Sequence, residues 1–305
     1  MEEKIERQEW IESIKSLCLY SSENELEILY TISNHTEKFY VPKIIKKRNG
    51  SNRQLYVPKP ILKQIQKNIL NNVLYAFPVS DYAMAYVKNR SLVENAKPHV
   101  NKKIILKLDI EDFFGSISSE KIYRLFTKEQ FSSQVRTLLT HLVTYLDVLP
   151  QGAPTSPYIS NLVMKDFDEE IGTYCEMRKI DYTRYCDDLT FSGNFDCWEV
   201  KRKVSALLKR KGFILNEKKT RIIKKNNAQV VTGIVVNEKV NVRKTLQKRL
   251  RQELYYIKKY GIESHVKRIG EEKETYKRHL MGQINYCISI HPKKEFIEYK
   301  NLLQK

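Results

Sequence analysis

Apolar side chains recur three and four residues apart along much of the chain, which is the spacing of one helix face. In residues 1–34 this pattern predicts two short helices packed against the body of the protein, with Ser21-Ser22 as the N-cap of the second. After two prolines, the stripe from Ile61 to Leu74 predicts a longer helix that faces a core. The same spacing predicts further helices over 120–147, 159–171, 200–208 and most of the chain beyond 242.

Other stretches are rich in β-branched and aromatic residues and predict strands. From Phe39 to Val57 apolar and polar residues alternate around an Asn-Gly pair, which predicts a β-hairpin with a basic tip. The segment from Lys103 to Asp109 is an apolar strand that ends in acidic residues. Tyr182 to Ser192 predicts a second hairpin, with Asp187 and Asp188 at or near its turn.

The adjacent carboxylates of Asp187 and Asp188 suggest a metal site. Each anion raises the free energy of the other's ionised form unless a cation neutralises both, and a divalent metal does so. Asp109 could lie beside them on a neighbouring strand. Carboxylate oxygens suit Mg²⁺, whose coordination is completed by water and substrate phosphates, and two such ions catalyse in-line phosphoryl transfer. An Asp-Asp pair alone also occurs in many turns as solvated carboxylates, so the prediction of a catalytic set depends on Asp109.

The positive charge of the chain is concentrated in its C-terminal third. Residues 1–200 hold 26 basic and 27 acidic side chains, residues 201–305 hold 28 and 9, and the whole chain carries +18. Such a field attracts polyanions in a salt-dependent way, which indicates a nucleic-acid partner. An anionic membrane surface is the other candidate, but no separate basic amphipathic helix is found at either terminus.

Cysteine usage and hydropathy point to the cytoplasm. The five cysteines lack Cys-x-x-Cys spacing, and their odd number argues against a closed disulfide framework. No stretch approaches 18 uninterrupted apolar residues, and the first thirty residues lack a basic segment followed by an apolar one, so neither export nor a membrane partner is expected. A chain of 305 residues with 41% hydrophobic content can bury an ample core, in one large domain or two.

Several motifs resemble, in order and spacing, those of reverse transcriptases. They are the strand Leu108-Asp109-Ile110-Glu111-Asp112-Phe113-Phe114, the loop from Leu149 to Pro157, and Tyr185-Cys186-Asp187-Asp188. Two further motifs, Asn95-Ala96-Lys97-Pro98-His99 and Val231-Thr232-Gly233, resemble those of bacterial retron reverse transcriptases. Retron relatives usually have Ala at the position of Cys186, which is expected to be a buried small residue here.

The resemblance implies an α+β right-hand polymerase with fingers, palm and thumb, a small antiparallel palm sheet and a helical thumb. The implied divisions are N-terminal helices (1–35), fingers (36–100), palm with interspersed fingers helices (101–240) and thumb (241–305). The implied activity is RNA-directed DNA synthesis with two Mg²⁺ ions. The implied catalytic residues are Asp109, Asp187 and Asp188, and the implied metal ligands are these three with Ile110.

The retron resemblance also implies partners. The template and primer would be one cognate structured noncoding RNA, primed from a guanosine 2′-hydroxyl and extended with deoxynucleoside triphosphates into a branched RNA–DNA product. A separate effector protein in anti-phage defence and a host ribonuclease H are further implied partners. The alternatives are a non-catalytic RNA-binding scaffold of the same fold and a bacterial reverse transcriptase of the group II intron or diversity-generating kind.

The nucleotide-binding residues implied by the resemblance come from four segments. They are Lys47, Arg53, Phe114, Gln151, Gly152 and Lys219. Lys47, for which Lys46 or Arg48 could substitute, would contact the triphosphate with Arg53. Phe114 would lie under the sugar and exclude a 2′-hydroxyl.

Two departures or ambiguities affect this set. Gly115 stands where relatives commonly have proline after the aromatic pair, so the backbone beside Phe114 is expected to be looser. Lys219 best matches the lysine near the leaving pyrophosphate, with Lys218 or a merely solvated lysine as the alternative.

The residues implied to contact RNA or primer lie in three further segments. They are Asn95, His99, Val231, Thr232, Gly233, Arg243, Lys244, Lys248 and Arg251. Asn95 and His99 lie four residues apart on a predicted helix and could bond either a neighbouring backbone or an RNA sugar-phosphate. Residues 229–236 predict one buried strand in which Gly233 allows close contact with a neighbour. Tyrosines among the basic residues beyond 242 could stack on bases or belong to the core.

Overall fold

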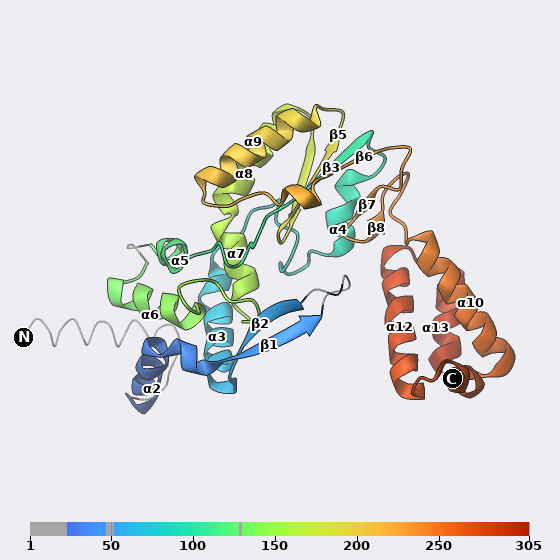
Figure 1. Cartoon of the computed structure of the whole chain (residues 1–305), viewed down its shortest axis with the longest axis horizontal. Coiled ribbons are helices and arrows are strands. Elements are labelled where there is room, and N and C mark those ends of the chain that lie inside the picture. The colour runs from blue at the N-terminus through green and yellow to red at the C-terminus, as the bar shows by residue number, and fades with distance from the viewer. Residues whose placement is uncertain (1–22, 47–49, 51, 128–129, 305) are drawn as a thin grey trace, which may run out of the picture.

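The computed structural model describes residues 23–46, 50, 52–127 and 130–304 of the chain. Figure 1 shows α2 and α6 toward one end of an elongated molecule, a sheet in the middle, and the helices α10 to α13 at the other end, with the β1–β2 hairpin extending from α2 toward the middle. The strands are β1 (Tyr40–Lys46), β2 (Asn52–Pro58), β3 (Ile104–Asp109), β4 (Asp181–Tyr185), β5 (Asp188–Gly193), β6 (Arg221–Lys224), β7 (Val230–Val231) and β8 (Ile234–Val235).

The helices follow the predicted apolar stripes. They are α2 (Glu23–Asn34), α3 (Pro60–Asn72), α4 (Leu92–Ala96), α5 (Ser119–Leu125), α6 (Ser133–Val143), α7 (Ser156–Val163), α8 (Lys165–Met177), α9 (Cys197–Arg210), α10 (Lys244–Tyr260), α11 (Ile262–Ile269), α12 (Lys273–Ile290) and α13 (Lys294–Gln304). Short 3₁₀ turns include η3 (Lys97–His99) and η4 (Glu217–Lys219). The first predicted helix and the Ser21-Ser22 cap lie outside the described residues. Among the described residues, no helix is both long and apolar enough to cross a bilayer.

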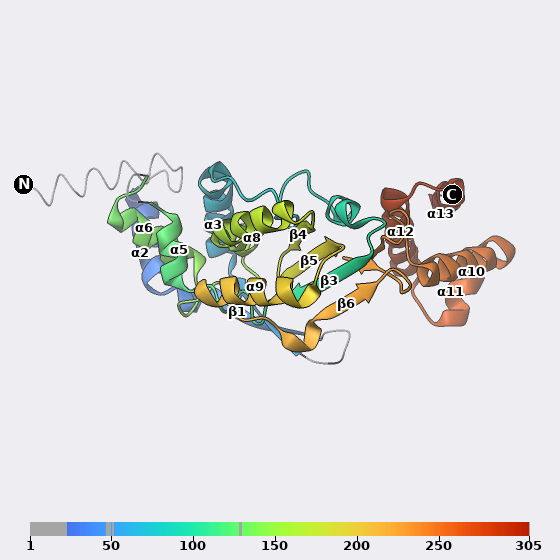
Figure 2. The same ribbon diagram turned by 90° about the horizontal axis from the view of Figure 1, so that it is seen from above.

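The central sheet has the strand order β4-β5-β3-β6, and every neighbouring pair is antiparallel. Because side chains alternate along a strand, β3 presents Leu106 and Leu108 to one face of the sheet and Ile105 to the other. Leu106 and Leu108 share a hydrophobic core with Phe167 of α8 and Val204 of α9, which cover that face (Figure 2). The opposite face therefore carries the residues in register with Ile105.

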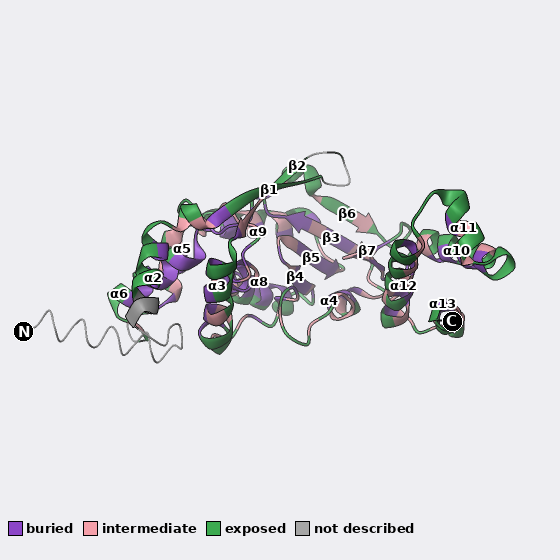
Figure 3. Cartoon of the chain, turned by 90° about the horizontal axis from the view of Figure 1, so that it is seen from below, coloured by how far each residue is buried: buried purple, intermediate pink, exposed green. Residues whose placement is uncertain are grey.

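A second hydrophobic core belongs to the C-terminal helical unit (residues 244–304). It contains Leu254 of α10, Ile284 of α12 and Phe296 of α13, and it reaches Ile105 of β3 and Ala96 of α4. Figure 3 shows buried residues along β3, β4 and β5 and on the facing sides of these helices. Since each fully buried aliphatic side chain stabilises the fold by about 1.5–3 kcal/mol, this shared core holds the helical unit against β3 and α4.

Two predicted features differ from the structure. The predicted single strand 229–236 is instead a hairpin, because Thr232 (φ 44°) and Gly233 (φ 91°) form a two-residue turn between β7 and β8. Gly233 does make a close contact, since a Cβ there would lie 3.3 Å from the hydroxyl of Tyr286. The apolar spacing from Tyr276 to Tyr286 predicts that the last helix ends before Pro292, but a further helix, α13, follows it and buries Phe296 and Leu303.

Candidate active site

Three aspartates meet where β3 ends and the β4–β5 hairpin turns. Asp109 is the last residue of β3 and lies opposite Asp188, the first residue of β5. Cys186 and Asp187 form the two-residue turn, with Cys186 in the left-handed region (φ 61°). The Ile110 amide donates a hydrogen bond to the Asp187 carbonyl at 3.1 Å. The sequence-based expectation that Asp109 lies beside the doublet on a neighbouring strand is therefore confirmed.

The face of the sheet that carries these acids follows from the register. Asp109 and Asp188 lie on the same face as Ile105, opposite the face covered by α8 and α9. Lys107 and Thr190, two residues further along their strands, form the next cross-strand pair on that face. The carboxylates thus lie on the face of the sheet that α8 and α9 leave uncovered.

Lys219 neutralises Asp109 in this arrangement. Its ammonium nitrogen lies 2.8 Å from both carboxylate oxygens of Asp109, whose side chain is 7% exposed, while that of Lys219 is 58% exposed. Burial raises the pKa of Asp109 above its usual value, Lys219 opposes that rise, and the charges of Asp187 and Asp188 add to it. Burial also raises the pKa of Asp188, against the effect of Lys107. Because Lys219 neutralises only Asp109, one further cation would offset the negative charge that remains on Asp187 and Asp188.

The donor set fits a hard divalent cation, although it does not enclose one unaided. Within the described part of the chain, no three His, Cys, Asp or Glu side chains are grouped closely enough to hold a metal ion. Mg²⁺ needs only one or two carboxylates when substrate phosphates and water supply the other oxygens. Oxygens of Asp109, Asp187, Asp188 and the Ile110 backbone would hold such an ion. Lys219 must then give up at least one oxygen of Asp109.

The loop from Leu149 to Pro157, which lies between β3 and β4 in the chain, packs against the β1–β2 hairpin. The Tyr56 amide donates to the carbonyl of Gln151 at 2.8 Å. At Gly152, where φ is 125°, a Cβ would lie 2.7 Å from the Tyr56 carbonyl oxygen. Only glycine fits this approach, because an L side chain would both strain the backbone and collide with β2. Gln151 and Gly152 thus connect the loop to the strand that carries Arg53.

The Gly152→Ala substitution is expected to lower the free energy of unfolding by about 1–3 kcal/mol, the cost of strained backbone in an unfavourable region. Gly282 of α12 is the matched control, because a Cβ there meets nothing within 4 Å. Gly282→Ala should stabilise by about 0.5–1 kcal/mol, since alanine is the better helix former. Urea denaturation of the two variants measures both values, and equal effects would contradict the close approach at Gly152.

The other residues expected to bind nucleotide are placed as follows. Arg53 lies on β2 opposite Ile45 and is exposed, whereas Lys47 lies outside the described residues. Phe114 is half-buried, with its ring centroid 5.5 Å from that of Phe113. A Cβ at Gly115 would lie 2.3 Å from a carboxylate oxygen of Asp112, so the turn after Phe114 is filled by that side chain.

Asn95 and His99 are fully buried and bind other parts of the protein. Asn95 donates to the Thr232 hydroxyl at 3.2 Å, which joins the two motifs that resemble those of retron enzymes. The ring nitrogens of His99 lie 2.7 Å from the Ser192 hydroxyl and 2.8 Å from the Thr183 hydroxyl, on β5 and β4. Of the two alternatives left open by the sequence, the structure shows protein contacts. These side chains join the β7–β8 hairpin to the sheet that carries Asp188.

Acidification is expected to destabilise the protein through His99. Burial lowers the pKa of His99 from 6.5 to about 3, so the unfolded state binds a proton that the folded state excludes. The stability contribution is complete above pH 6.5 and is lost at about 1.4 kcal/mol per unit as pH falls toward 3. Unfolding free energies at pH 7 and pH 5 should therefore differ less in His99→Gln than in the parent. The exposed control His35→Gln should keep the parent's dependence, and an unchanged slope in His99→Gln would refute the assignment.

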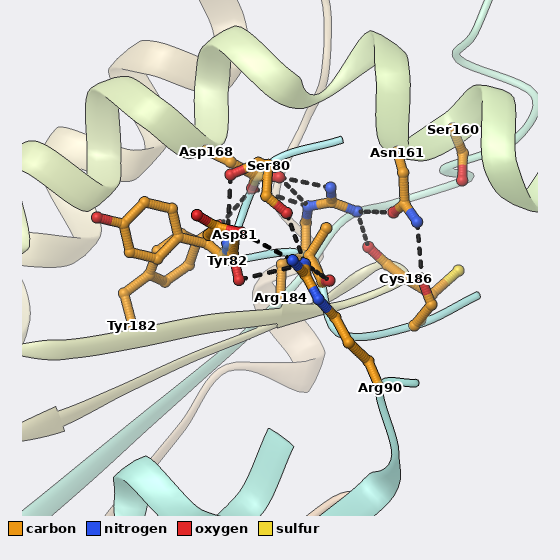
Figure 4. A network of polar contacts seen from close by, with 12 residues as sticks. Ser80, Asp81, Tyr82, Arg90, Ser160, Asn161, Asp168, Tyr182, Arg184 and Cys186 are labelled. Carbon is orange, nitrogen blue, oxygen red and sulfur yellow. Dashed lines mark hydrogen bonds and ion pairs between the residues drawn. The ribbon is translucent and has the colours of Figure 1, made fainter. Parts of the chain in front are cut away.

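A buried polar network behind the catalytic turn was missed by the sequence analysis (Figure 4). Arg184 of β4 is fully buried and forms an ion pair with Asp168 of α8, with nitrogen–oxygen distances of 2.5–3.1 Å. Arg184 also donates to the side chain of Asn161 at 2.9 Å and to the carbonyl of Cys186 at 3.2 Å. Tyr182 donates to Asp168 at 2.8 Å. The sequence signal for this network is that Asp168 in α8 and Arg184 in β4 each occupy a buried position where an apolar residue would be expected.

Cys186 itself is a buried small residue, as expected. It is 7% exposed, and burial raises the pKa of its thiol to about 12. Burial therefore favours the neutral thiol at neutral pH.

The predicted RNA and primer residues fall into two groups. Val231 is buried in the second core, and Thr232 and Gly233 form the β7–β8 turn. The basic residues lie at the start of α10. Arg243, Lys244 and Lys248 are exposed, whereas Arg251 forms an ion pair with Glu295 of α13 at 2.7 Å.

Comparison with known proteins identifies the family. The model of the reverse transcriptase (RNA-dependent DNA polymerase) family matches residues 45–259. Among solved structures, the telomerase of Candida albicans in complex with a TWJ fragment of telomeric RNA is 11% identical, with a TM-score of 0.48 over 87% of this chain and 66% of that one. The retron Ec86 reverse transcriptase of Escherichia coli is 31% identical over 258 residues, covering 83% of this chain and 77% of that protein. The retron Ec83 reverse transcriptase of Escherichia coli is 34% identical over 268 residues, covering 83% of each chain. The chain is therefore an RNA-directed DNA polymerase that belongs to the reverse transcriptase family and, within it, to the retron reverse transcriptases.

Proposed function

We propose that the enzyme copies part of one cognate structured noncoding RNA into DNA, starting from a guanosine 2′-hydroxyl of that RNA. The observation that carries the chemistry is the pairing of Asp109 with Asp188 beside the Asp187 turn, on the face of the sheet opposite α8 and α9. Reverse transcriptases generally use divalent metal ions. Two Mg²⁺ ions, when bound, would activate the attacking hydroxyl and neutralise charge on the phosphates.

The side chains of the chain bind and orient the reactants around that centre. Asp109, Asp187 and Asp188, with Ile110, hold the metals, and Lys219 exchanges its bond with Asp109 for the leaving pyrophosphate. Its ammonium group is already within 2.8 Å of Asp109 and is more than half exposed, so little reorganisation is needed.

Nucleotide selection belongs to residues on either side of the centre. Arg53 and Lys47 bind the triphosphate, Phe114 contacts the sugar and excludes a 2′-hydroxyl, and Gln151 and Gly152 border the template. The chain divides accordingly into N-terminal helices, fingers, palm and thumb at residues 36, 101 and 241.

RNA contacts come from the exposed cations of α10, while Asn95 and His99 act indirectly by holding the β7–β8 hairpin against the sheet. Arg243, Lys244 and Lys248 are exposed at the start of that helix, close in sequence to the hairpin. The product is a branched RNA–DNA molecule made in the cytoplasm, after host ribonuclease H removes template RNA. A separate effector protein uses it in anti-phage defence.

Sequencing the nucleic acid that copurifies with the protein tests this function. The expected result is one structured RNA joined through a 2′,5′ branch to DNA complementary to part of it. The matched control is the Asp187→Asn, Asp188→Asn double variant, which should copurify with the same RNA and no DNA. Abundant RNA without DNA on the parent would favour the scaffold alternative. Unbranched DNA copied from an intron or a repeat would favour another class of reverse transcriptase.

A further inference from the structure

A cavity of about 560 Å³ lies between α10, α11 and α12 in the C-terminal helical unit. It lies at the end of the molecule away from the β1–β2 hairpin, and its lining comes from helices that carry none of the catalytic residues (Figure 1). The lining side chains used below are Arg249, Glu253, Tyr256, His265, Arg268 and Tyr276. The volume is in the range of protein sites for small ligands.

Aromatic rings form one side of this cavity. The ring of Tyr256 is nearly parallel to that of His265, with an interplanar angle of 10° and centroids 6.2 Å apart. Tyr276, which also lines the cavity, lies 5.5 Å from His265. Tyr260, outside the lining, stacks on Tyr256 at 6.2 Å and 20°. Parallel rings that line a cavity offer flat faces on which another planar group can stack.

Hydrogen bonds hold part of this aromatic wall in place. Tyr276 is 7% exposed; its hydroxyl donates to Glu253 and lies 3.0 Å from Nε2 of His265. These bonds connect the three helices around the cavity. The rings of His265 and Tyr276 are thus positioned before any ligand arrives, which reduces the ordering cost of binding.

Two arginines supply positive charge beside the rings. The guanidinium carbon of Arg268 lies 5.6 Å from the centroid of the Tyr256 ring, and Arg268 forms no ion pair or hydrogen bond with another described residue. Arg249 donates to Gln283 at 2.6 Å and lies 3.9 Å from Glu253. Glu253 and Glu271 also line the cavity, but Arg268 has no acidic partner among the described residues. Flat rings next to this arginine match a ligand that is planar at one end and anionic at the other. A nucleotide has that chemistry.

We propose that this cavity binds one unpaired nucleotide of the RNA, with its base against Tyr256 and His265 and its phosphate at Arg268. The Glu253 carboxylate can accept a hydrogen bond from an N–H group on the edge of the base. A paired nucleotide cannot enter, because its base is stacked and its pairing edge is occupied. The cavity therefore recognises a loop, bulge or end of the RNA, separately from the active site. The inference rests on the proposed function only in taking RNA as the partner.

Binding of a fluorescein-labelled single-stranded RNA 12-mer of mixed sequence to the full chain tests the stacking contact. Tyr256→Leu should weaken binding about tenfold, because stacking of one base on an aromatic ring contributes an effect of that order. Tyr255→Leu is the matched control, since Tyr255 is 58% exposed on the same helix and does not line the cavity. It should change the dissociation constant less than twofold. A duplex of the same length should bind both variants and the parent equally.

Arg268→Gln tests the phosphate contact without risk to folding, because Arg268 is exposed and unpaired among the described residues. It should weaken binding of the single-stranded RNA and reduce by about one the slope of log affinity against log salt. Lys267 is exposed and lies outside the cavity, so Lys267→Gln should weaken binding of the single-stranded RNA less than Arg268→Gln does. Photocrosslinking of a 5-iodouridine-substituted 12-mer should label Tyr256 or His265.

Equal binding by Tyr256→Leu and Tyr255→Leu, or crosslinks only outside the cavity, would overturn the inference. The outcome is independent of catalysis. A parent that incorporates deoxynucleotides but shows no cavity crosslink refutes this inference alone. A parent that crosslinks at Tyr256 without incorporating deoxynucleotides refutes the proposed function alone.

Discussion

Replacing Arg184 with methionine is expected to lower the free energy of unfolding by about 3–5 kcal/mol. Arg184 and Asp168 are both fully buried, and Asp168 would be left as a charge without its cation. Asn161 would lose one partner as well, although it keeps its bond to the Ala85 carbonyl at 2.7 Å. The loss exceeds the value of the bonds themselves, because an uncompensated buried charge is the main cost.

Exposed and buried ion pairs give the matched control for this result. Arg210 of α9 forms an ion pair with Glu170 of α8, the helix that carries Asp168, but the Arg210 side chain is 61% exposed. Arg210→Met should therefore cost less than about 1 kcal/mol. The double variant Arg184→Met, Asp168→Leu should recover part of the loss, since neither charge remains buried. Equal unfolding free energies for Arg184→Met and Arg210→Met in urea titrations would show that the buried network does not stabilise the fold.

The same arginine positions the catalytic turn. Its guanidinium donates to the Cys186 carbonyl, one residue before Asp187, while it is held by Asp168 on α8. Arg184→Lys keeps the charge but cannot make all these bonds from one ammonium group. The Mg²⁺ concentration for half-maximal incorporation should therefore rise in Arg184→Lys, measured where the variant is fully folded. An unchanged metal requirement would limit Arg184 to a structural role.

Asp188→Asn is expected to slow deoxynucleotide incorporation by about 10³-fold, or on the order of 4 kcal/mol of transition-state stabilisation. The amide keeps the shape of the side chain but removes the negative charge that a metal ion requires. Folding should not suffer, because burial already raises the pKa of Asp188 and so disfavours its charged form. Single-turnover primer extension measures the rate, and thermal unfolding measures the stability of the same sample.

Asp112→Asn is the matched control for that substitution. Asp112 is exposed, follows Asp109 by three residues, and has a left-handed φ of 38° that asparagine also adopts readily. Its rate should stay within about twofold of the parent. A comparable loss in Asp112→Asn would mean that general negative charge, rather than the paired aspartates, supports the reaction.

The sequence could predict that three aspartates meet at one edge of the sheet because the signals for it are local. An apolar strand that ends at Asp109 and a hairpin centred on Asp187 each follow from a few adjacent residues. Pairing of these strands then places Asp109 opposite Asp188, as the structure shows. The β1–β2 hairpin was predicted from its Asn-Gly turn for the same reason.

Other features depend on contacts between distant segments, which local patterns do not encode. Arg184 and Asp168 are 16 residues apart on different elements, and each alone resembles a surface charge. The burial of His99 depends on hydroxyls of Thr183 and Ser192, more than 80 residues away. In residues 229–236 the apolar run predicts a single strand. The turn at Thr232 could not be predicted, because threonine rarely adopts the positive φ that it has there.

Templated incorporation by the full chain tests the central claim most directly. With Mg²⁺, an RNA template of defined sequence and a labelled primer, the account predicts extension by deoxynucleotides, with a product that is complementary to the template when sequenced. Absence of extension under conditions where the protein is folded and RNA-bound, or extension whose sequence is independent of the template, would contradict it.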